Sequence, residues 1–250
     1  MQRITGNGQQ SPELLIGADP RSALAEAYRQ LRTSVLLSVA GRAPKSFLVT
    51  SSMPSEGKTT TAVNTAVSLT QTGATVVIID ADMRRPRLHS IFNMQNNRGL
   101  STILSSEMGE TEMLSLLQAH ETPGLFVLPA GTIPPNPAEL IGSDQMKRLL
   151  HALESGFTYV VVDSPPISSF TDGVLIATLV DGVLLVVHGG KSSRHIVRRS
   201  RQVLLEVGAK IFGVVLNNVN LRAHDYYYDR YYSQSYYNKD EEAPSVSSEV

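Results

Sequence analysis

The fold is decided by residues 47–82, which read FLVTSSMPSEGKTTTAVNTAVSLTQTGATVVIIDAD. The segment begins with an apolar run, passes through a turn that contains glycine, continues as a stretch of helix length and ends in a second apolar run. Both runs are continuous and rich in Val and Ile, which is typical of strands buried on both faces of a parallel sheet. Residues 47–82 therefore predict a strand, a helix and a second strand.

The same alternation continues to residue 217. The expected strands are residues 47–51, 76–80, 125–129, 159–163, 183–187 and 211–217, and the expected helices include Thr59–Gln71, Asp144–Ser155 and Ser193–Val207. Strands that alternate with helices indicate an α/β fold, here a doubly wound, mostly parallel sheet with flanking helices.

The two ends of the chain differ from this centre. Residues 1–19 are polar and rich in Gly, Gln and Ser, and they predict a flexible arm. Residues 20–220 are expected to form the main domain, which starts with a helix from about Ser22 to Val39. Residues 221–250 have almost no aliphatic side chains before their last positions, so a disordered C-terminal tail is expected.

Composition narrows the classes of function. The 250 residues carry a formal net charge of -1, so a global basic field for nucleic acid is absent and no nucleic-acid partner is expected. The chain has no cysteine, which argues against an iron–sulfur ATPase. The apolar runs are far shorter than the roughly 20 residues that a bilayer requires, and the first residues lack the apolar core of a signal peptide. We therefore expect a cytoplasmic protein that another molecule holds at any membrane.

A phosphate-binding loop is expected between the first strand and its helix. Backbone N–H groups and the dipole at a helix N-terminus attract phosphate. Gly57 permits close approach of the backbone, Lys58 reaches the outer phosphates, and the Thr59 hydroxyl can ligate Mg²⁺. Ser52 replaces the first glycine of the general pattern, and the alternative is an ordinary turn with a surface lysine. The expected nucleotide-binding residues of this loop are Ser52, Pro54, Ser55, Glu56, Gly57, Lys58, Thr59 and Thr60.

A second Gly-Lys sequence, GGKS at residues 189–192, also follows an apolar run. The glycine that the pattern requires five positions before Gly190 is Leu185. We interpret this segment as a loop with a solvated lysine.

Two of the expected strands end in aspartate, in the segments VVIIDAD and VVVDSPP. The carboxyl ends of parallel strands face the crevice where α/β folds bind ligands. Asp80, Asp82 and Asp163 could therefore hold Mg²⁺ or its waters, and one of them could accept a proton. In an extended segment Asp80 and Asp82 share one face. Each aspartate alone is more often a turn or cap residue, but together with the loop they predict a single site.

The segments SSMPSEGKTT, VVIIDADMRRP and VVVDSPP resemble the Walker A, Walker A′ and Walker B motifs of the bacterial tyrosine kinases of capsule and exopolysaccharide synthesis. These enzymes belong to the deviant P-loop NTPases, which include partition and division-site ATPases. The resemblance covers roughly residues 20–237 and is to the form in which the kinase is a separate chain.

The resemblance implies ATP and Mg²⁺ as cofactors. The metal would be held by Thr59, Asp82 and Asp163. The catalytic residues would be Asp80, Asp82, Lys58 and Arg84. Asp80 is the candidate to accept the tyrosine proton, and Arg84 would orient the acceptor or balance phosphate charge, although the sequence does not fix which aspartate has which role. Asn217 or Asn218 would read adenine, and both remain open.

Two further features carry the resemblance. Glu26, Arg29 and Arg32 match the family's Glu-x-x-Arg-x-x-Arg motif for ring-like self-association, and the alternative is a solvated, salt-bridged helix face. Seven of the nine tyrosines crowd into the tail among acidic residues, which work against nucleic-acid binding. The expected phosphate acceptors are Tyr226, Tyr227, Tyr228, Tyr231, Tyr232, Tyr236 and Tyr237.

By resemblance, the expected function is ATP-dependent autophosphorylation of this tyrosine cluster, in trans around a ring, in the control of polysaccharide synthesis. The expected partners are a membrane-anchored activator of the polysaccharide co-polymerase type, other copies of the chain and a protein-tyrosine phosphatase. Such an activator would recruit the chain to the inner face of the membrane.

Two rival interpretations remain. A partition- or division-type switch ATPase would hydrolyse ATP without tyrosine transfer, but such proteins usually have a lysine at the position of Met53. A non-catalytic regulator would only present phosphotyrosines made by another kinase, but Lys58, Thr59 and the three aspartates argue against it.

Overall fold

A computed structural model describes residues 11–18 and 21–219, without the side chains of residues 17 and 18. The chain divides into two units, Met1–Asn217 and Asn218–Val250. Of the second unit, only Asn218 and Val219 lie among the described residues. In the described part of the chain, no helix is long and apolar enough to cross a membrane.

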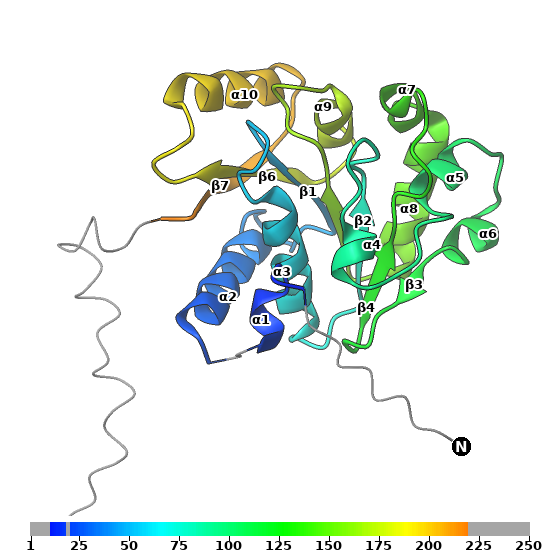
Figure 1. Cartoon of the computed structure of the whole chain (residues 1–250), viewed down its shortest axis with the longest axis horizontal. Helices are drawn as coiled ribbons and strands as arrows, with labels where there is room; N and C mark the ends of the chain where they lie inside the picture. Colours follow the sequence, from blue (N-terminus) through cyan, green and yellow to red (C-terminus); the bar gives the residue numbers. More distant parts are fainter. Residues whose placement is uncertain (1–10, 19–20, 220–250) are drawn as a thin grey trace, which may run out of the picture. The chain divides into compact units, whose positions relative to one another are not determined.

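The first unit is built on a seven-stranded sheet with the order β3-β4-β2-β5-β1-β6-β7 (Figure 1). All neighbouring strands pair in parallel except β3 and β4. The strands are β1 (Ser46–Ser51), β2 (Val76–Asp80), β3 (Gln118–Ala119), β4 (Leu125–Leu128), β5 (Tyr159–Asp163), β6 (Gly182–His188) and β7 (Ile211–Asn217). The six strands expected from the sequence are present within about one residue, and β3 was not expected.

Helices cover both faces of this sheet, so the predicted doubly wound fold is confirmed. Successive strand residues point to opposite faces, and accordingly Phe47 and Val49 belong to one apolar core whereas Leu48 belongs to the other. The first core is closed by α1 (Leu15–Ala18), α2 (Ala23–Leu36), α3 (Lys58–Thr70) and α4 (Leu88–Ile91). The second is closed by α5 (Leu100–Leu104), α6 (Glu110–Leu114), α7 (Pro137–Ile141), α8 (Asp144–Gly156), α9 (Asp172–Ala177) and α10 (Arg194–Glu206).

Residues 11–18 differ from the predicted flexible arm. Ile16 is only 1% exposed and packs in the core beside α3. The backbone N–H groups of Leu15 and Ile16 donate to the side-chain oxygen of Asn64 on α3, over 2.9 and 3.1 Å. This segment is therefore tied to the helix that follows the phosphate loop. The rest of the predicted arm, residues 1–10 and 19, lies outside the described residues.

Helix α2 begins where it was expected and ends earlier. The Ser22 side chain accepts a hydrogen bond from Ala25 N and caps the helix. The last residue is Leu36 rather than Val39, and Leu37, at the C-cap, is 77% exposed. Burial of Leu37 therefore does not favour another helical turn.

Candidate active site

The sheet order brings the three predicted motifs to one edge. Strand β5 lies between β1 and β2, and Asp163 pairs with Val49 on one side and with Asp80 on the other. The ends of these strands therefore converge with the loop that follows β1. Both Asp80 and Asp163 are fully buried.

The loop after β1 has the backbone of a phosphate cradle. Gly57 precedes α3 with a φ of 94°, a conformation that favours glycine. A Cβ atom at Gly57 would lie 1.9 Å from the side-chain nitrogen of Asn217. That nitrogen donates to the carbonyl oxygen of Glu56 over 3.0 Å. Of the two candidate asparagines, Asn217 thus contacts the loop, whereas Asn218 is exposed and belongs to the second unit.

Glu56 fixes the shape of the loop from inside. The side chain is 3% exposed, accepts a 2.8 Å hydrogen bond from Met53 N and accepts a second bond from the Ser192 hydroxyl. Pro54 and Ser55 lie exposed on the outer rim of the loop. The buried Ser52 hydroxyl has no hydrogen-bond partner in the described part of the chain.

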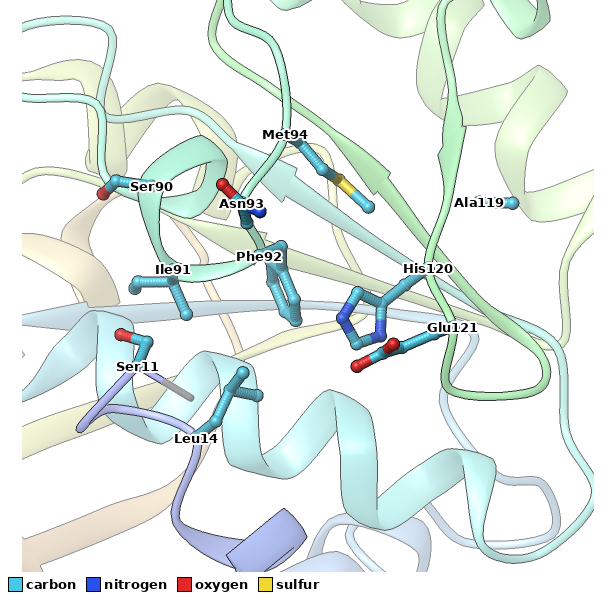
Figure 2. A pocket seen from close by; sticks show the side chains of 10 residues that line it. All are labelled: Ser11, Leu14, Ser90, Ile91, Phe92, Asn93, Met94, Ala119, His120 and Glu121. Carbon is cyan, nitrogen blue, oxygen red and sulfur yellow. The ribbon is translucent and has the colours of Figure 1, made fainter. Parts of the chain in front are cut away.

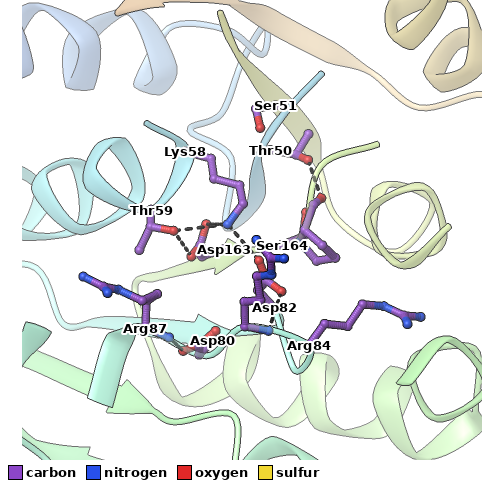
Figure 3. A network of polar contacts seen from close by, with 12 residues as sticks. Thr50, Ser51, Lys58, Thr59, Asp80, Asp82, Arg84, Arg87, Asp163 and Ser164 are labelled. Atoms are coloured by element: carbon purple, nitrogen blue, oxygen red, sulfur yellow. Dashed lines mark hydrogen bonds and ion pairs between the residues drawn. The ribbon is translucent and has the colours of Figure 1, made fainter. Parts of the chain in front are cut away.

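Lys58 lies in the centre of the site (Figure 3). Its ammonium group is 2.9 Å from Asp82, 3.8 Å from Asp163 and 3.2 Å from the Thr59 hydroxyl. Burial lowers the pKa of Lys58, but the charges of Asp163 and Asp82 outweigh it, so the net shift is upward. Lys58 therefore remains a cation and can meet a phosphate.

Asp80 sits slightly apart from this group. One of its oxygens accepts hydrogen bonds from Arg87 N at 2.8 Å and Leu88 N at 2.9 Å, and the other has no partner in the described part of the chain. Burial, followed by the charge of Asp163, raises the pKa of Asp80 to about 7. A carboxyl group with this pKa can gain and lose a proton near neutral pH. Asp80 and Asp82 thus make different contacts, although both lie at this strand end.

The residues fit a magnesium nucleotide. The Thr59 hydroxyl donates to one oxygen of Asp163 over 2.7 Å, and the other oxygen of Asp163 is buried without a hydrogen bond in the described chain. Burial raises the pKa of Asp163 to about 6 against the lowering effects of Lys58 and Thr59. No cluster of three or more His, Asp or Glu side chains that could hold a metal occurs among the described residues. Mg²⁺ commonly needs only one or two carboxylates, because phosphates and water supply its other ligands.

Arg84 does not join the Lys58 group, which modifies the predicted role in balancing phosphate charge. Its guanidinium group lies 4.2 Å above the ring of Phe170 and 3.3 Å from the buried carboxylate of Asp172. In Figure 3 the Arg84 side chain points away from Lys58. Arg84 therefore ties the end of β2 to the start of α9.

Two contributors to the site were missed in the sequence, Ser192 and Asp172. Ser192 contacts Glu56 across 136 residues, and Asp172 contacts Arg84 across 88 residues. Asp172 belongs to no local motif. Ser192 ends the Gly-Gly-Lys-Ser sequence at residues 189–192, but that sequence indicates only a solvated loop and carries no signal for a contact with Glu56.

The proposed self-association motif lies on α2. Glu26 and Arg29 form an ion pair of 2.7 Å, and the Arg32 side chain donates to the carbonyl oxygen of Ser68 on α3 over 2.6 Å. Glu26 and Arg29 are partly exposed. The seven predicted acceptor tyrosines, Tyr226 to Tyr237, lie outside the described residues.

The fold and the site define a P-loop NTPase of the ParA type. A ParA family model, described as NUBPL iron-transfer P-loop NTPase, matches residues 43–231. The cell division ATPase MinD of Pyrococcus furiosus superposes with a TM-score of 0.58 at 21% identity, over 69% of this chain and 71% of the MinD chain. At that identity, MinD supports the fold alone.

Relatives of higher sequence identity place the chain within one group of these P-loop NTPases. Tyrosine-protein kinase YwqD of Bacillus subtilis is 36% identical over 84% of this chain and 87% of its own length. Putative tyrosine-protein kinase CapB of Staphylococcus aureus is 34% identical over 87% of this chain and 94% of its own. The kinase domain of the Escherichia coli tyrosine kinase ETK superposes with a TM-score of 0.79 at 30% identity, over 87% of this chain and 84% of that one. The chain belongs to the family of bacterial tyrosine-protein kinases.

Proposed function

We propose that this chain transfers the γ-phosphoryl group of ATP to tyrosine, with Mg²⁺ as the metal. The observation that carries the proposal is the arrangement around Lys58, which faces Asp82 and Asp163 at the mouth of the loop closed by Gly57. Phosphoryl transfer needs positioning and charge stabilisation more than covalent help from the protein. The Gly57 loop and Lys58 supply both to a triphosphate, and bound Mg²⁺ would neutralise further phosphate charge beside Thr59 and Asp163.

Asp80 is the proposed base of this reaction. In the transfer, the tyrosine oxygen forms a bond to the γ-phosphorus, the bond from that phosphorus to the β–γ bridging oxygen breaks, and the phenol proton passes to Asp80. The pKa of about 7 supports this role, because a base that is partly deprotonated at neutral pH can both accept and release the proton. The Asp80 oxygen that has no hydrogen-bond partner among the described residues is buried, so a tyrosine hydroxyl would reach it only once the site opens.

The proposed acceptors are the tail tyrosines Tyr226 to Tyr237, phosphorylated by a neighbouring copy. The supporting observation is the motif on α2, where Glu26 and Arg29 remain partly exposed for contact with another copy. Each phosphate would add about -1.5 to -2 charges to an acidic tail. Mutual repulsion would then disassemble the ring.

The remaining proposals concern the cellular setting. We propose that the chain is cytoplasmic and is recruited to the inner face of the membrane by a membrane-anchored activator of the polysaccharide co-polymerase type. A protein-tyrosine phosphatase would reset the tail, and the cycle would regulate capsular or extracellular polysaccharide synthesis. The similarity of this chain to YwqD and CapB supports these proposals about its cellular setting.

The test is intact-mass spectrometry of the purified chain incubated with ATP and Mg²⁺, beside a Lys58→Met control and with an activator tail peptide supplied. Phosphates that map to Tyr226–Tyr237 in the wild type alone support the proposal. ATP hydrolysis without phosphate on the chain would favour a switch ATPase, which the MinD-like fold also fits. Equal phosphate on wild type and variant as isolated would favour a non-catalytic regulator.

A further inference from the structure

A cavity of about 730 Å³ lies on the α4 side of the sheet, apart from the phosphate loop (Figure 2). Three parts of the chain enclose it: the segment that leads to α1, the end of α4 with the residues that follow, and the hairpin between β3 and β4. None of the predicted site residues lines the cavity. The proposed phosphoryl transfer therefore leaves it unexplained.

The lining of the cavity is mixed, with an apolar part formed by Leu14, Ile91, Phe92 and Met94 and a polar part formed by Ser11, Ser90, Asn93 and Glu121. Phe92 packs edge-on against the ring of His120, with 5.0 Å between the ring centres, and Met94 and Leu14 add partly buried apolar surface. His120 Nδ1 accepts a hydrogen bond from Thr122 N, which fixes the ring. Glu121 is exposed, and the structure gives it no ion pair within the described residues. The apolar part of the lining thus suits a large aliphatic side chain, and Glu121 suits a cation next to it.

The residues that immediately precede the cavity have this chemistry. Ser11 lines the cavity, and residues 1–10 read MQRITGNGQQ. Arg3 is the only charged side chain among these ten residues, and Ile4 stands next to it. Six residues lie between Ile4 and Ser11, and the seven steps of chain from one to the other span at most about 25 Å. Gly6 and Gly8 let it fold back without a steric penalty.

We propose that residues 1–10 of the same chain occupy this cavity, with Ile4 against Phe92 and His120 and with Arg3 paired to Glu121. The tether at Ser11, the apolar part of the lining and the complementary charge of Glu121 all favour this occupant. Burying Ile4 would remove apolar surface from water on both sides, which favours association. The short tether keeps the effective concentration of Ile4 near the millimolar range, so a weak contact suffices.

Occupation of the cavity would bear on the active site through α4. The first N–H groups at this helix, those of Arg87 and Leu88, bond to Asp80, and Arg87 also forms an ion pair of 2.6 Å with Glu13. Ile91 at the other end of α4 lines the cavity. Residues 1–10 would therefore steady the helix that orients Asp80, although their binding does not depend on the proposed reaction.

Because the chain has no cysteine, disulfide trapping can test the proposal in the full-length protein. In the double variant Ile4→Cys/Ala119→Cys, the second cysteine lies on the cavity wall. The control is Ile4→Cys/Ser155→Cys, whose second cysteine is also exposed and lies on α8, which packs on the opposite face of the sheet. Under a glutathione redox buffer, we expect an intramolecular disulfide in the first variant to form at least about tenfold faster than in the control. Thiol counting and intact mass measure the rate.

Charge reversal provides the second arm of the test. Arg3→Glu should slow trapping in the cavity pair several-fold, and Arg3→Glu with Glu121→Arg should restore it. Equal trapping rates for the cavity pair and the control pair would overturn the proposal. A disulfide that joins two chains, seen as a dimer on a non-reducing gel, would show instead that the cavity takes residues 1–10 of another copy.

Discussion

Two loops of this protein follow neighbouring buried strands and share the letters Gly-Lys. Gly57-Lys58-Thr59 follows β1, and Gly190-Lys191-Ser192 follows β6. Both glycines have positive φ angles, 94° and 73°. The local backbone alone therefore does not distinguish a phosphate cradle from a surface turn.

The surroundings distinguish the two loops. Lys58 starts a helix of 13 residues, its side chain is 13% exposed, and two buried aspartates face it. Lys191 is exposed, α10 begins only at Arg194, and the structure gives Lys191 no ion pair within the described residues. A Cβ at Gly57 would collide with Asn217, whereas one at Gly190 would meet nothing within 4 Å. A Gly-Lys loop thus becomes a phosphate site when residues after other strands surround it, here the aspartates that face Lys58 and the asparagine that packs against Gly57.

The second loop nevertheless supports the first. The Ser192 hydroxyl donates to one oxygen of the Glu56 carboxylate, and the other oxygen of Glu56 accepts a hydrogen bond from Met53 N. The loop that contains Ser192 does not bind phosphate itself, but it stabilises the shape of the phosphate loop.

The largest expected difference is between the two lysines. Lys58→Met should lower tyrosine phosphorylation at least about 100-fold, because it removes the cation that faces the transferred group. Lys191→Met should stay within about twofold of the wild type. Radiolabelled ATP measures both, and circular dichroism checks that each variant is folded. Similar losses in the two variants would show that Lys58 has no special role in phosphoryl transfer.

The two glycines should differ in the same direction as the lysines. Gly57→Ala should reduce nucleotide affinity tenfold or more, roughly 1.4 kcal/mol, because the new methyl group would displace Asn217 from the loop. Gly190→Ala should cost only the strain of a left-handed residue, about 1 kcal/mol of unfolding free energy, with unchanged affinity. Calorimetric titration with ADP and thermal unfolding separate these outcomes. Normal affinity of Gly57→Ala would contradict the cradle.

The carboxylates near Lys58 predict a dependence on pH. The pKa of Asp80 is raised from 3.8 to about 7 in the folded protein, so the folded state binds a proton that the unfolded state releases. The stability that this proton contributes is fully present below about pH 4 and is lost as the pH rises through 7. Without Mg²⁺ and nucleotide, Asp80→Asn should therefore raise the melting temperature more at pH 8 than at pH 5. Asp144→Asn, at an exposed carboxyl on α8, is the control and should show no such trend between these pH values.

Ser192 supports the phosphate loop indirectly, so its replacement should weaken nucleotide binding less than Gly57→Ala does. Ser192→Ala should lower the free energy of unfolding by about 1.5 kcal/mol, because a buried carboxylate loses a donor. Nucleotide affinity should fall only a few-fold, because Met53 N still holds Glu56. Ser193→Ala is the neighbouring control, since the structure gives the Ser193 side chain no cap hydrogen bond. Chemical denaturation of the two variants would reveal whether the supporting contact matters.

Much of the fold was predictable because the strands are continuous apolar runs and the long helices lie between them. The bounds of β2, β5 and β7 agree with the prediction to the residue. Helices of four or five residues, such as α4 and α5, were not expected, because one turn of chain shows no periodicity. The order of the strands, which places Asp163 beside Asp80, also has no local signature.

The site was predictable in its members but less so in its contacts. The sequence placed Lys58, Thr59 and the three aspartates together because all follow parallel strands at one edge. It left Asn217 and Asn218 as alternatives, and only the first meets the loop. Arg84 was expected near phosphate, yet Asp172 and Phe170, far along the chain, draw it away.

The Asn64 side chain couples the segment before α2 to helix α3. Asn64 accepts hydrogen bonds from the amides of Leu15 and Ile16 and donates to the carbonyl oxygens of Glu13 and Thr60. The amide protons of Leu15 and Ile16 should therefore exchange with deuterated water slowly and together with those of α3. The exchange rates of these two amide protons would then show whether α3, the helix that follows the phosphate loop, is folded.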